Sequence, residues 1–327
     1  MRLLTLGGGG NIGFWVEKEF LDKGHEVLSV SRGLKEAKRQ YQENTTSLFY
    51  LKTDINSPSI SLRNEISEAD VIIDFVCFNQ KEASLRNTLL AEFSGLYLMI
   101  STVAVYDRDH NLNVLSSSSS CNTLTWPYAR NKYEAEMAIK NYKTSYEKKI
   151  LRLGHTFDIS LPVPFGPGDW TIPTWLLEGE PLLIHRSGES VWPLLHSIDA
   201  AKRIYFVATN PEVFTDTINI VAKATVTWVE IGLAFFRRLG LEPNFKYISI
   251  DELRTKHKYW SESVQFHKGF DERYVGVEQD IFKEFLPQDL DIETGLRISF
   301  EWYLSNSDSR RVNSQALLDL SLLKTGI

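Results

Sequence analysis

A glycine-rich turn near the start of the chain places the strongest constraint on the fold. The apolar run Leu3–Leu6 leads directly into Gly7-Gly8-Gly9-Gly10-Asn11-Ile12-Gly13, and the following residues have helical periodicity. In such a turn Gly7 permits a tight bend, Gly10 lets the backbone approach a pyrophosphate, and Gly13 lets the helix pack closely on the strand. The free amide hydrogens and the helix dipole favour phosphate charge. This unit predicts a dinucleotide-binding site formed by Gly7, Gly10, Asn11, Ile12 and Gly13, and its flanking strand and helix argue against a merely flexible turn.

The rest of the first half of the chain alternates apolar runs with segments of mostly helical period. Alternation of this kind is typical of a parallel sheet covered by helices on both faces. The sequence therefore predicts an α/β fold with a doubly wound parallel Rossmann sheet. The expected strands are Leu3 to Leu6, Glu26 to Val30, Leu48 to Leu51, Val71 to Val76, Tyr97 to Ile100 and Lys149 to Leu153.

The regular alternation of apolar runs and helical segments ends after Gly154, where prolines and glycines divide the chain into short elements. Residues 198–208 nevertheless have the pattern of a helix and residues 216–221 that of a strand, so the chain is expected to return to the sheet. We therefore expect two interleaved domains. Residues 1–160 with about 196–222 would form the NAD(P)-binding Rossmann domain, and about 161–195 with 223–327 a smaller substrate-binding region.

Composition and charge exclude several classes of protein. The 327 residues carry 36 basic and 42 acidic side chains, a formal net charge of -6, and no dense basic block. A nucleic-acid partner is therefore not expected. The apolar runs are shorter than the roughly 18 residues of a membrane span. Two cysteines, Cys77 and Cys121, are too few for a disulfide framework and favour the cytoplasm. The seven histidines are scattered, so no metal site is expected.

Two polar residues that follow strands could contact the adenosine part of the cofactor. The strand that ends at Val30 is followed by Ser31 and Arg32, where an acidic residue usually binds the adenosine ribose. Arg32 could pair with a 2'-phosphate, which favours NADP over NAD, although a solvated arginine would also fit this position. Asp54 follows the third strand and could accept a hydrogen bond from adenine or simply cap a helix.

A tyrosine and a lysine form the expected catalytic pair. Tyr128 and Lys132 are spaced i and i+4 on one face of a helix predicted to run to about Lys143. A tyrosine with an ordinary pKa of about 10 is a poor acid-base catalyst at neutral pH, but a neighbouring ammonium favours its phenolate. Tyr128 could then exchange a proton with a substrate oxygen while hydride moves to or from nicotinamide.

Together these motifs resemble the extended branch of the short-chain dehydrogenases/reductases, the NAD-dependent epimerase/dehydratase family. The resemblance covers nearly the whole chain. It implies that Thr102, four residues before Tyr106, supplies the catalytic hydroxyl beside Tyr128 and Lys132, and that Lys132 also holds the nicotinamide ribose. It further implies that His155 lies near the nicotinamide and that the protein is a homodimer. The matching segments are residues 7–13, 101–106, 128–132, 152–157, 166–169 and 196–199.

The chain also departs from this branch at two places. The dehydratases and decarboxylases carry carboxylates directly after the catalytic hydroxyl, where this chain has Val103 and Ala104, so those reactions are discounted. Sugar-nucleotide enzymes hold the diphosphate with an arginine at the position of Trp192. An indole cannot neutralise a diphosphate, so a sugar-nucleotide substrate would require another cation, such as Arg186 or Arg203.

Two hypotheses of function follow. In the first, the protein is an NAD(P)-dependent epimerase or ketoreductase that acts on a sugar nucleotide or another hydroxy or keto small molecule through Thr102, Tyr128 and Lys132. In the second, it resembles members of the family that have lost enzymatic activity, and it is a nucleotide-bound protein that binds RNA or another protein. The intact triad favours the enzyme.

Overall fold

A parallel sheet dominates the first part of the molecule. The computed structural model describes residues 1–33, 46–106, 114–119, 121, 126–164, 166–185, 188–189, 191–249, 276–277, 282 and 284–325. Its main sheet has seven strands in the order β12-β7-β5-β4-β1-β2-β3, and every neighbouring pair is parallel. The strands are β1 (Arg2–Leu6), β2 (Glu26–Ser31), β3 (Leu48–Lys52), β4 (Val71–Asp74), β5 (Leu96–Thr102), β7 (Glu147–Leu153) and β12 (Thr217–Ile220).

The strand order reverses direction at β1. From β1 the chain runs outward through β2 and β3, and it then crosses to β4 on the other side of β1 and continues outward to β12. Ligands of such sheets bind outside the carboxyl ends of the strands at this switch point, which lies beside the glycine turn. The predicted fold class is confirmed.

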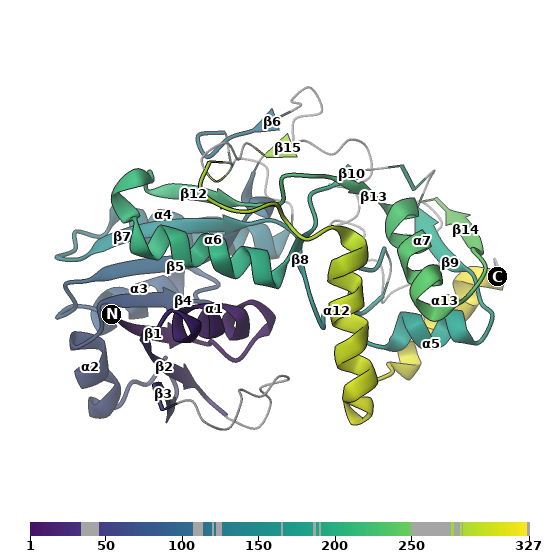
Figure 1. Cartoon of the computed structure of the whole chain (residues 1–327). Helices are drawn as coiled ribbons and strands as arrows, with labels where there is room; N and C mark the ends of the chain where they lie inside the picture. Colours follow the sequence, from purple (N-terminus) through teal and green to yellow (C-terminus); the bar gives the residue numbers. More distant parts are fainter. Residues whose placement is uncertain are drawn as a thin grey trace.

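Helices cover both faces of the sheet (Figure 1). On one face α1 (Asn11–Asp22) packs against α6 (Ser197–Thr209) over a core that includes Val16, Phe20 and Ile204. The other face is covered by α2 (Ile60–Ser67), α3 (Gln80–Leu89) and α4 (Pro127–Asn141). The inner strands β1 and β4 are almost entirely buried, which explains their nearly continuous apolar sequences, whereas the edge strand β3 is partly exposed.

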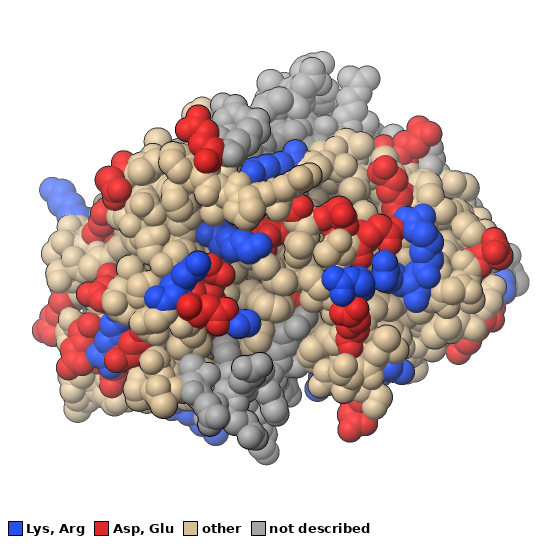
Figure 2. Space-filling view, viewed as in Figure 1, with Lys and Arg blue, Asp and Glu red and all other residues tan. Residues whose placement is uncertain are grey.

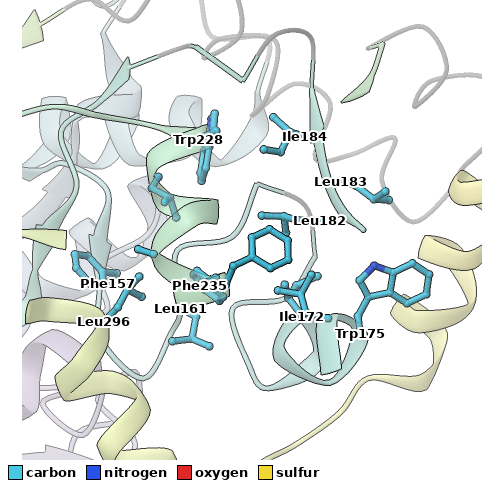
Figure 3. Packing of buried hydrophobic residues seen from close by; sticks show 14 of the residues in the cluster. Phe157, Leu161, Ile172, Trp175, Leu182, Leu183, Ile184, Trp228, Phe235 and Leu296 are labelled. Carbon is cyan, nitrogen blue, oxygen red and sulfur yellow. The ribbon is translucent and has the colours of Figure 1, made fainter. Parts of the chain in front are cut away.

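A second apolar core lies beside the sheet, under α5, α7, α12 and α13 (Figure 1). Figure 3 shows how Trp228 and Phe235 of α7 pack among Phe157, Ile172 and Leu182. The elements here are α5 (Thr171–Leu177), α7 (Trp228–Leu239), α12 (Ile292–Ser305), α13 (Ser314–Thr325) and the parallel pair β9 (Leu182–His185) and β14 (Phe245–Ile248).

Short strand pairs connect the two cores. The described chain contains β8 (Thr156–Phe157) with β11 (Leu195–His196), β10 (Val191–Trp192) with β13 (Val226–Thr227), and β6 (Val114–Leu115) with β15 (Gly276–Val277).

The chain returns to the main sheet through α6 and β12, as the sequence predicts. Thr227 then starts α7 with a capping box to Glu230, and Gly240 ends that helix at φ 69°. Among the described residues, no helix combines the length and the apolar character that a membrane crossing requires. Lysines, arginines and carboxylates are interspersed on the face of the molecule that Figure 2 shows.

Candidate active site

The glycine turn has a shape that suits a pyrophosphate. Gly7 has a φ of 81°, a conformation that glycine adopts without strain. Gly13 approaches the carbonyl oxygen of Gly8 so closely that a Cβ would overlap it. Beside Gly10, in contrast, a Cβ would have no described atom within 4 Å. Gly10 is the N-cap of α1, and no described side chain caps it, so the first amides of the helix are available to an anion.

A buried carboxylate supports this turn from below. Glu17 of α1 is buried and accepts a hydrogen bond from the hydroxyl of Thr5 on β1. A Cβ at Gly8 would overlap both of these side chains. Gly8 is therefore required for packing, a role that sequence analysis did not assign, because the glycine spacing alone does not show what lies beneath the turn.

The two residues expected at the adenosine end of the cofactor, Arg32 and Asp54, lie on the surface. Arg32 follows β2 and is exposed. Asp54 is also exposed, and its Oδ1 accepts the backbone N–H of Asn56 at 2.9 Å. Ser59, not Asp54, caps α2. The helix-cap interpretation of Asp54 is therefore wrong, because its carboxylate stabilises a turn that precedes the helix.

Tyr128 and Thr102 come together from two different elements. Tyr128 lies in the first turn of α4, directly after Pro127 at the helix start, and its side chain is 38% exposed. Thr102 ends β5, and its Oγ1 accepts the N–H of Ala104 at 3.2 Å. Desolvation raises the pKa of Tyr128, and a side-chain hydrogen bond with Thr102 partly opposes this rise.

Lys132 is anchored by two backbone carbonyl groups. Its buried ammonium donates hydrogen bonds to the carbonyl oxygens of Cys77 and Ile100, both at 2.9 Å, and lies 4.5 Å from the ring centroid of Phe78. Burial lowers the pKa of Lys132. The expected effect of Lys132 on the pKa of Tyr128, which follows from their i, i+4 spacing, stays a prediction.

Ser101 and Thr102 are adjacent hydroxyls with different surroundings. Ser101 is buried and donates to Oε1 of Glu136 at 2.5 Å. Glu136 in turn accepts a hydrogen bond from Nη2 of Arg152 at 2.6 Å, and both side chains are buried. Thr102 is only partly buried. Between the two, Thr102 is therefore the hydroxyl available to a substrate.

His155 lies just beyond the end of β7. Its ring meets that of Trp192 edge to face, with centroids 5.2 Å apart. Burial lowers the pKa of His155 to about 4, so the imidazole is neutral at neutral pH. Within the described chain, no group of histidine, cysteine, aspartate and glutamate is placed to hold a metal ion.

Trp192 and Arg203, which lie at or near the expected diphosphate position in the sequence, make contacts with other parts of the protein. Trp192 is 1% exposed and packs against Trp228 in the second core. Arg203 is equally buried and pairs with Asp289 at 2.6 Å. Arg186 lies outside the described residues.

Comparison with known proteins defines the class of this molecule. A family model, the NAD dependent epimerase/dehydratase family, matches residues 3–220. The chain belongs to this family of enzymes and is of the extended short-chain dehydrogenase/reductase type. Nothing in the matches supports the alternative of an RNA- or protein-binding protein.

One curated relative is the trifunctional UDP-glucose 4,6-dehydratase/UDP-4-keto-6-deoxy-D-glucose 3,5-epimerase/UDP-4-keto-L-rhamnose-reductase of Arabidopsis thaliana. It is 25% identical over 222 residues, which are 65% of this chain and 30% of the relative. The chain thus matches less than a third of the length of that protein.

Solved structures show the same fold at low sequence identity. A dTDP-glucose 4,6-dehydratase from Bacillus anthracis in complex with NAD has a TM-score of 0.70 at 20% identity, covering 94% of this chain and 98% of that one. A UDP-glucuronic acid 4-epimerase from Bacillus cereus, also with NAD, has a TM-score of 0.70 at 15% identity over 94% and 99% of the chains. A UDP-N-acetylglucosamine 4-epimerase from Methanobrevibacter ruminantium has a TM-score of 0.72 at 17% identity over 93% and 98%.

Proposed function

We propose that this protein is an NAD(P)-dependent epimerase that oxidises a secondary hydroxyl of a sugar nucleotide to a ketone and reduces it again from the opposite face. The observation that carries the proposal is that Thr102 at the end of β5 and Tyr128 in the first turn of α4 belong to two neighbouring elements of the sheet domain that also bears the glycine turn. The named reactions of the curated relative and of two structural neighbours support the reaction class.

The residues present fit a dinucleotide. The open space beside Gly10 and the uncapped amides of α1 suit the pyrophosphate, with Asn11, Ile12 and Gly13 forming the first turn of that helix. Bound NAD(P) supplies the hydride acceptor and donor. Lys132 would hold the nicotinamide ribose, His155 would border the nicotinamide, and Arg32 and Asp54 would lie at the adenosine end.

The proton steps fall to Tyr128 and Thr102. The hydroxyl of Tyr128 would take the proton from the substrate hydroxyl when its carbon is oxidised and return it when the ketone is reduced. Thr102 would hydrogen-bond the same substrate oxygen. The turn after Thr102 consists of Val103, Ala104 and Val105. Because it offers no carboxylate for a second proton transfer, epimerisation is favoured over dehydration.

The second core would form the substrate-binding region. We assign to it residues of about 161–195 and 223–327, and to the cofactor domain residues 1–160 with about 196–222. Neither Trp192 nor Arg203 is placed to neutralise a diphosphate, so another cation must bind that part of a sugar nucleotide.

A panel of UDP-sugars, dTDP-sugars and free sugars tests reaction and substrate class together. The protein should interconvert a pair of sugar nucleotides that differ at one carbinol carbon, without net consumption of NAD(P)H. Net oxidation of NADPH would make the protein a ketoreductase. Turnover of free sugars alone would overturn the sugar-nucleotide assignment while leaving the redox chemistry in place.

We also propose a cytoplasmic homodimer that forms through α3 and α4. These helices pack side by side on one face of the sheet, and Met137 on α4 is 38% exposed. Both cysteines are buried free thiols, as expected in a reducing compartment. A dimeric mass in solution that becomes monomeric in Met137→Arg would support this assembly, and a monomeric mass of the unmodified protein would overturn it.

A further inference from the structure

A buried ion pair lies directly behind the candidate catalytic residues. Glu136 is fully buried on α4 and Arg152 is 2% exposed on β7. Arg152 donates to Glu136 through Nε at 3.0 Å and through Nη2 at 2.6 Å. A bidentate pair of this kind fixes orientation as well as distance. It therefore ties α4 to β7 with a defined geometry.

The pair continues the face of α4 that carries the catalytic residues. Tyr128, Lys132 and Glu136 follow one another at a spacing of four, so they lie on the same side of the helix. Glu136 also raises the pKa of Lys132, which opposes part of the effect of burial. The ion pair is thus anchored two helical turns from Tyr128.

The same pair holds both ends of the turn that bears Thr102. At its start, Ser101 donates to Glu136 at 2.5 Å. At its end, the ring of Tyr106 lies 4.7 Å from the guanidinium carbon of Arg152, and its hydroxyl donates to Oδ1 of Asn219 on β12 at 2.6 Å. Thr102 itself caps the short helix Val103–Val105 between these two anchors.

From this geometry we infer that Glu136 and Arg152 are positioning residues that hold the turn bearing Thr102 in its place beside α4, the helix that bears Tyr128. The inference rests on the proposed function for its catalytic meaning. Its structural content concerns only the placement of this turn relative to α4. Neither Glu136 nor Arg152 would touch the substrate, and both would act through Ser101, Tyr106 and α4.

The test follows the surroundings of the Tyr128 hydroxyl without any substrate. Fluorotyrosine is incorporated, the Tyr128 signal is assigned with Tyr128→Phe, and the pKa of Tyr128 is measured by fluorine NMR. Because the Thr102 hydrogen bond lowers this pKa, Thr102→Val should raise it by about 0.5 to 1. Glu136→Gln should also raise the pKa of Tyr128. The double variant Glu136→Gln/Thr102→Val should have the same Tyr128 pKa as Thr102→Val alone.

Two further variants separate positioning from general destabilisation. Asp289→Asn breaks another buried arginine–carboxylate pair, Arg203 with Asp289 at 2.6 Å, and should lower the melting temperature without changing the pKa of Tyr128. Ser101→Ala removes only a neutral donor and provides a milder substitution if Glu136→Gln does not fold. It should raise the pKa of Tyr128 by less than Thr102→Val does.

The outcomes are distinct. An unchanged pKa of Tyr128 in Glu136→Gln and Ser101→Ala, or additive shifts in the double variant, would overturn the positioning role. An unchanged pKa in Thr102→Val would overturn the contact on which it depends. Loss of the proposed enzymatic function would appear separately, as absence of turnover in the unmodified protein. With an active substrate, Glu136→Gln should lower kcat about tenfold while cofactor affinity stays unchanged.

Discussion

The ammonium of Lys132 donates to the carbonyl oxygen of Cys77 at 2.9 Å and thereby joins α4 to the loop after β4. A second bond at the same distance reaches Ile100 on β5. Replacing Lys132 by methionine would leave both acceptors without this donor in a buried site. We expect the free energy of unfolding to fall by about 1–3 kcal/mol, measured by denaturant titration. Lys140→Met, on the exposed side of the same helix, should change it by less than about 0.5 kcal/mol.

Gly8 gives a sharp test of the support beneath the glycine turn. A Cβ at Gly8 would overlap the Glu17 carboxylate and the Thr5 hydroxyl, whereas a Cβ at Gly9 meets no described atom within 4 Å. Gly8→Ala should therefore destabilise the fold by about 1–3 kcal/mol and weaken nucleotide binding. Gly9→Ala should leave thermal stability nearly unchanged. Equal melting temperatures for the two variants would contradict the packing role of Gly8.

The half-buried imidazole of His155 predicts how stability depends on pH. Burial lowers its pKa from 6.5 to about 4, so between these values the unfolded chain binds more protons than the folded one. The contribution of His155 to the free energy of unfolding should therefore be fully present above pH 6.5. It should be lost as the pH drops towards 4, which lowers the free energy of unfolding by up to about 3 kcal/mol. Denaturant titrations across this range should show that His155→Asn removes most of the slope. An unaltered slope would show that other groups cause it.

Arg32 predicts a difference between the two nicotinamide cofactors. Its guanidinium is exposed after β2, where a 2'-phosphate on the adenosine ribose would lie. Arg32→Ala should weaken NADP binding about tenfold, the value of one charge-assisted hydrogen bond, and leave NAD binding within about threefold. Calorimetric titration of the nucleotide-free protein measures both affinities. Arg63→Ala, an exposed arginine on α2, is the matched control, and equal weakening of both cofactors by Arg32→Ala would remove Arg32 from the phosphate site.

Local sequence patterns predicted the main sheet well. The apolar runs at Leu3 and Val71, the glycine turn and the helix after it all follow rules that act within a few residues. The return of residues 217–220 to the edge of the sheet was also visible, because that strand retains an apolar pattern after a clear helix. These features require no knowledge of distant contacts.

The environment of the candidate site could not be predicted in the same way. The spacing of Tyr128 and Lys132 placed them on one face of the helix. It could not show that the ammonium of Lys132 would donate a hydrogen bond to the carbonyl oxygen of Cys77. The partners Glu136 and Arg152 lie on different elements and meet only in the folded chain. The spacing of Glu136 from Lys132 was the one local signal for this pair.

The central claim is that Tyr128 moves a proton as hydride passes between a sugar substrate and the nicotinamide. The most direct measurement is the absorbance of reduced nicotinamide when sugar nucleotides are mixed with the NAD-loaded protein and with Tyr128→Phe. We expect rapid formation of reduced nicotinamide in the unmodified protein and a loss of at least about 100-fold in rate in the variant, with nucleotide affinity preserved. Reduction at the same rate in Tyr128→Phe would contradict the account.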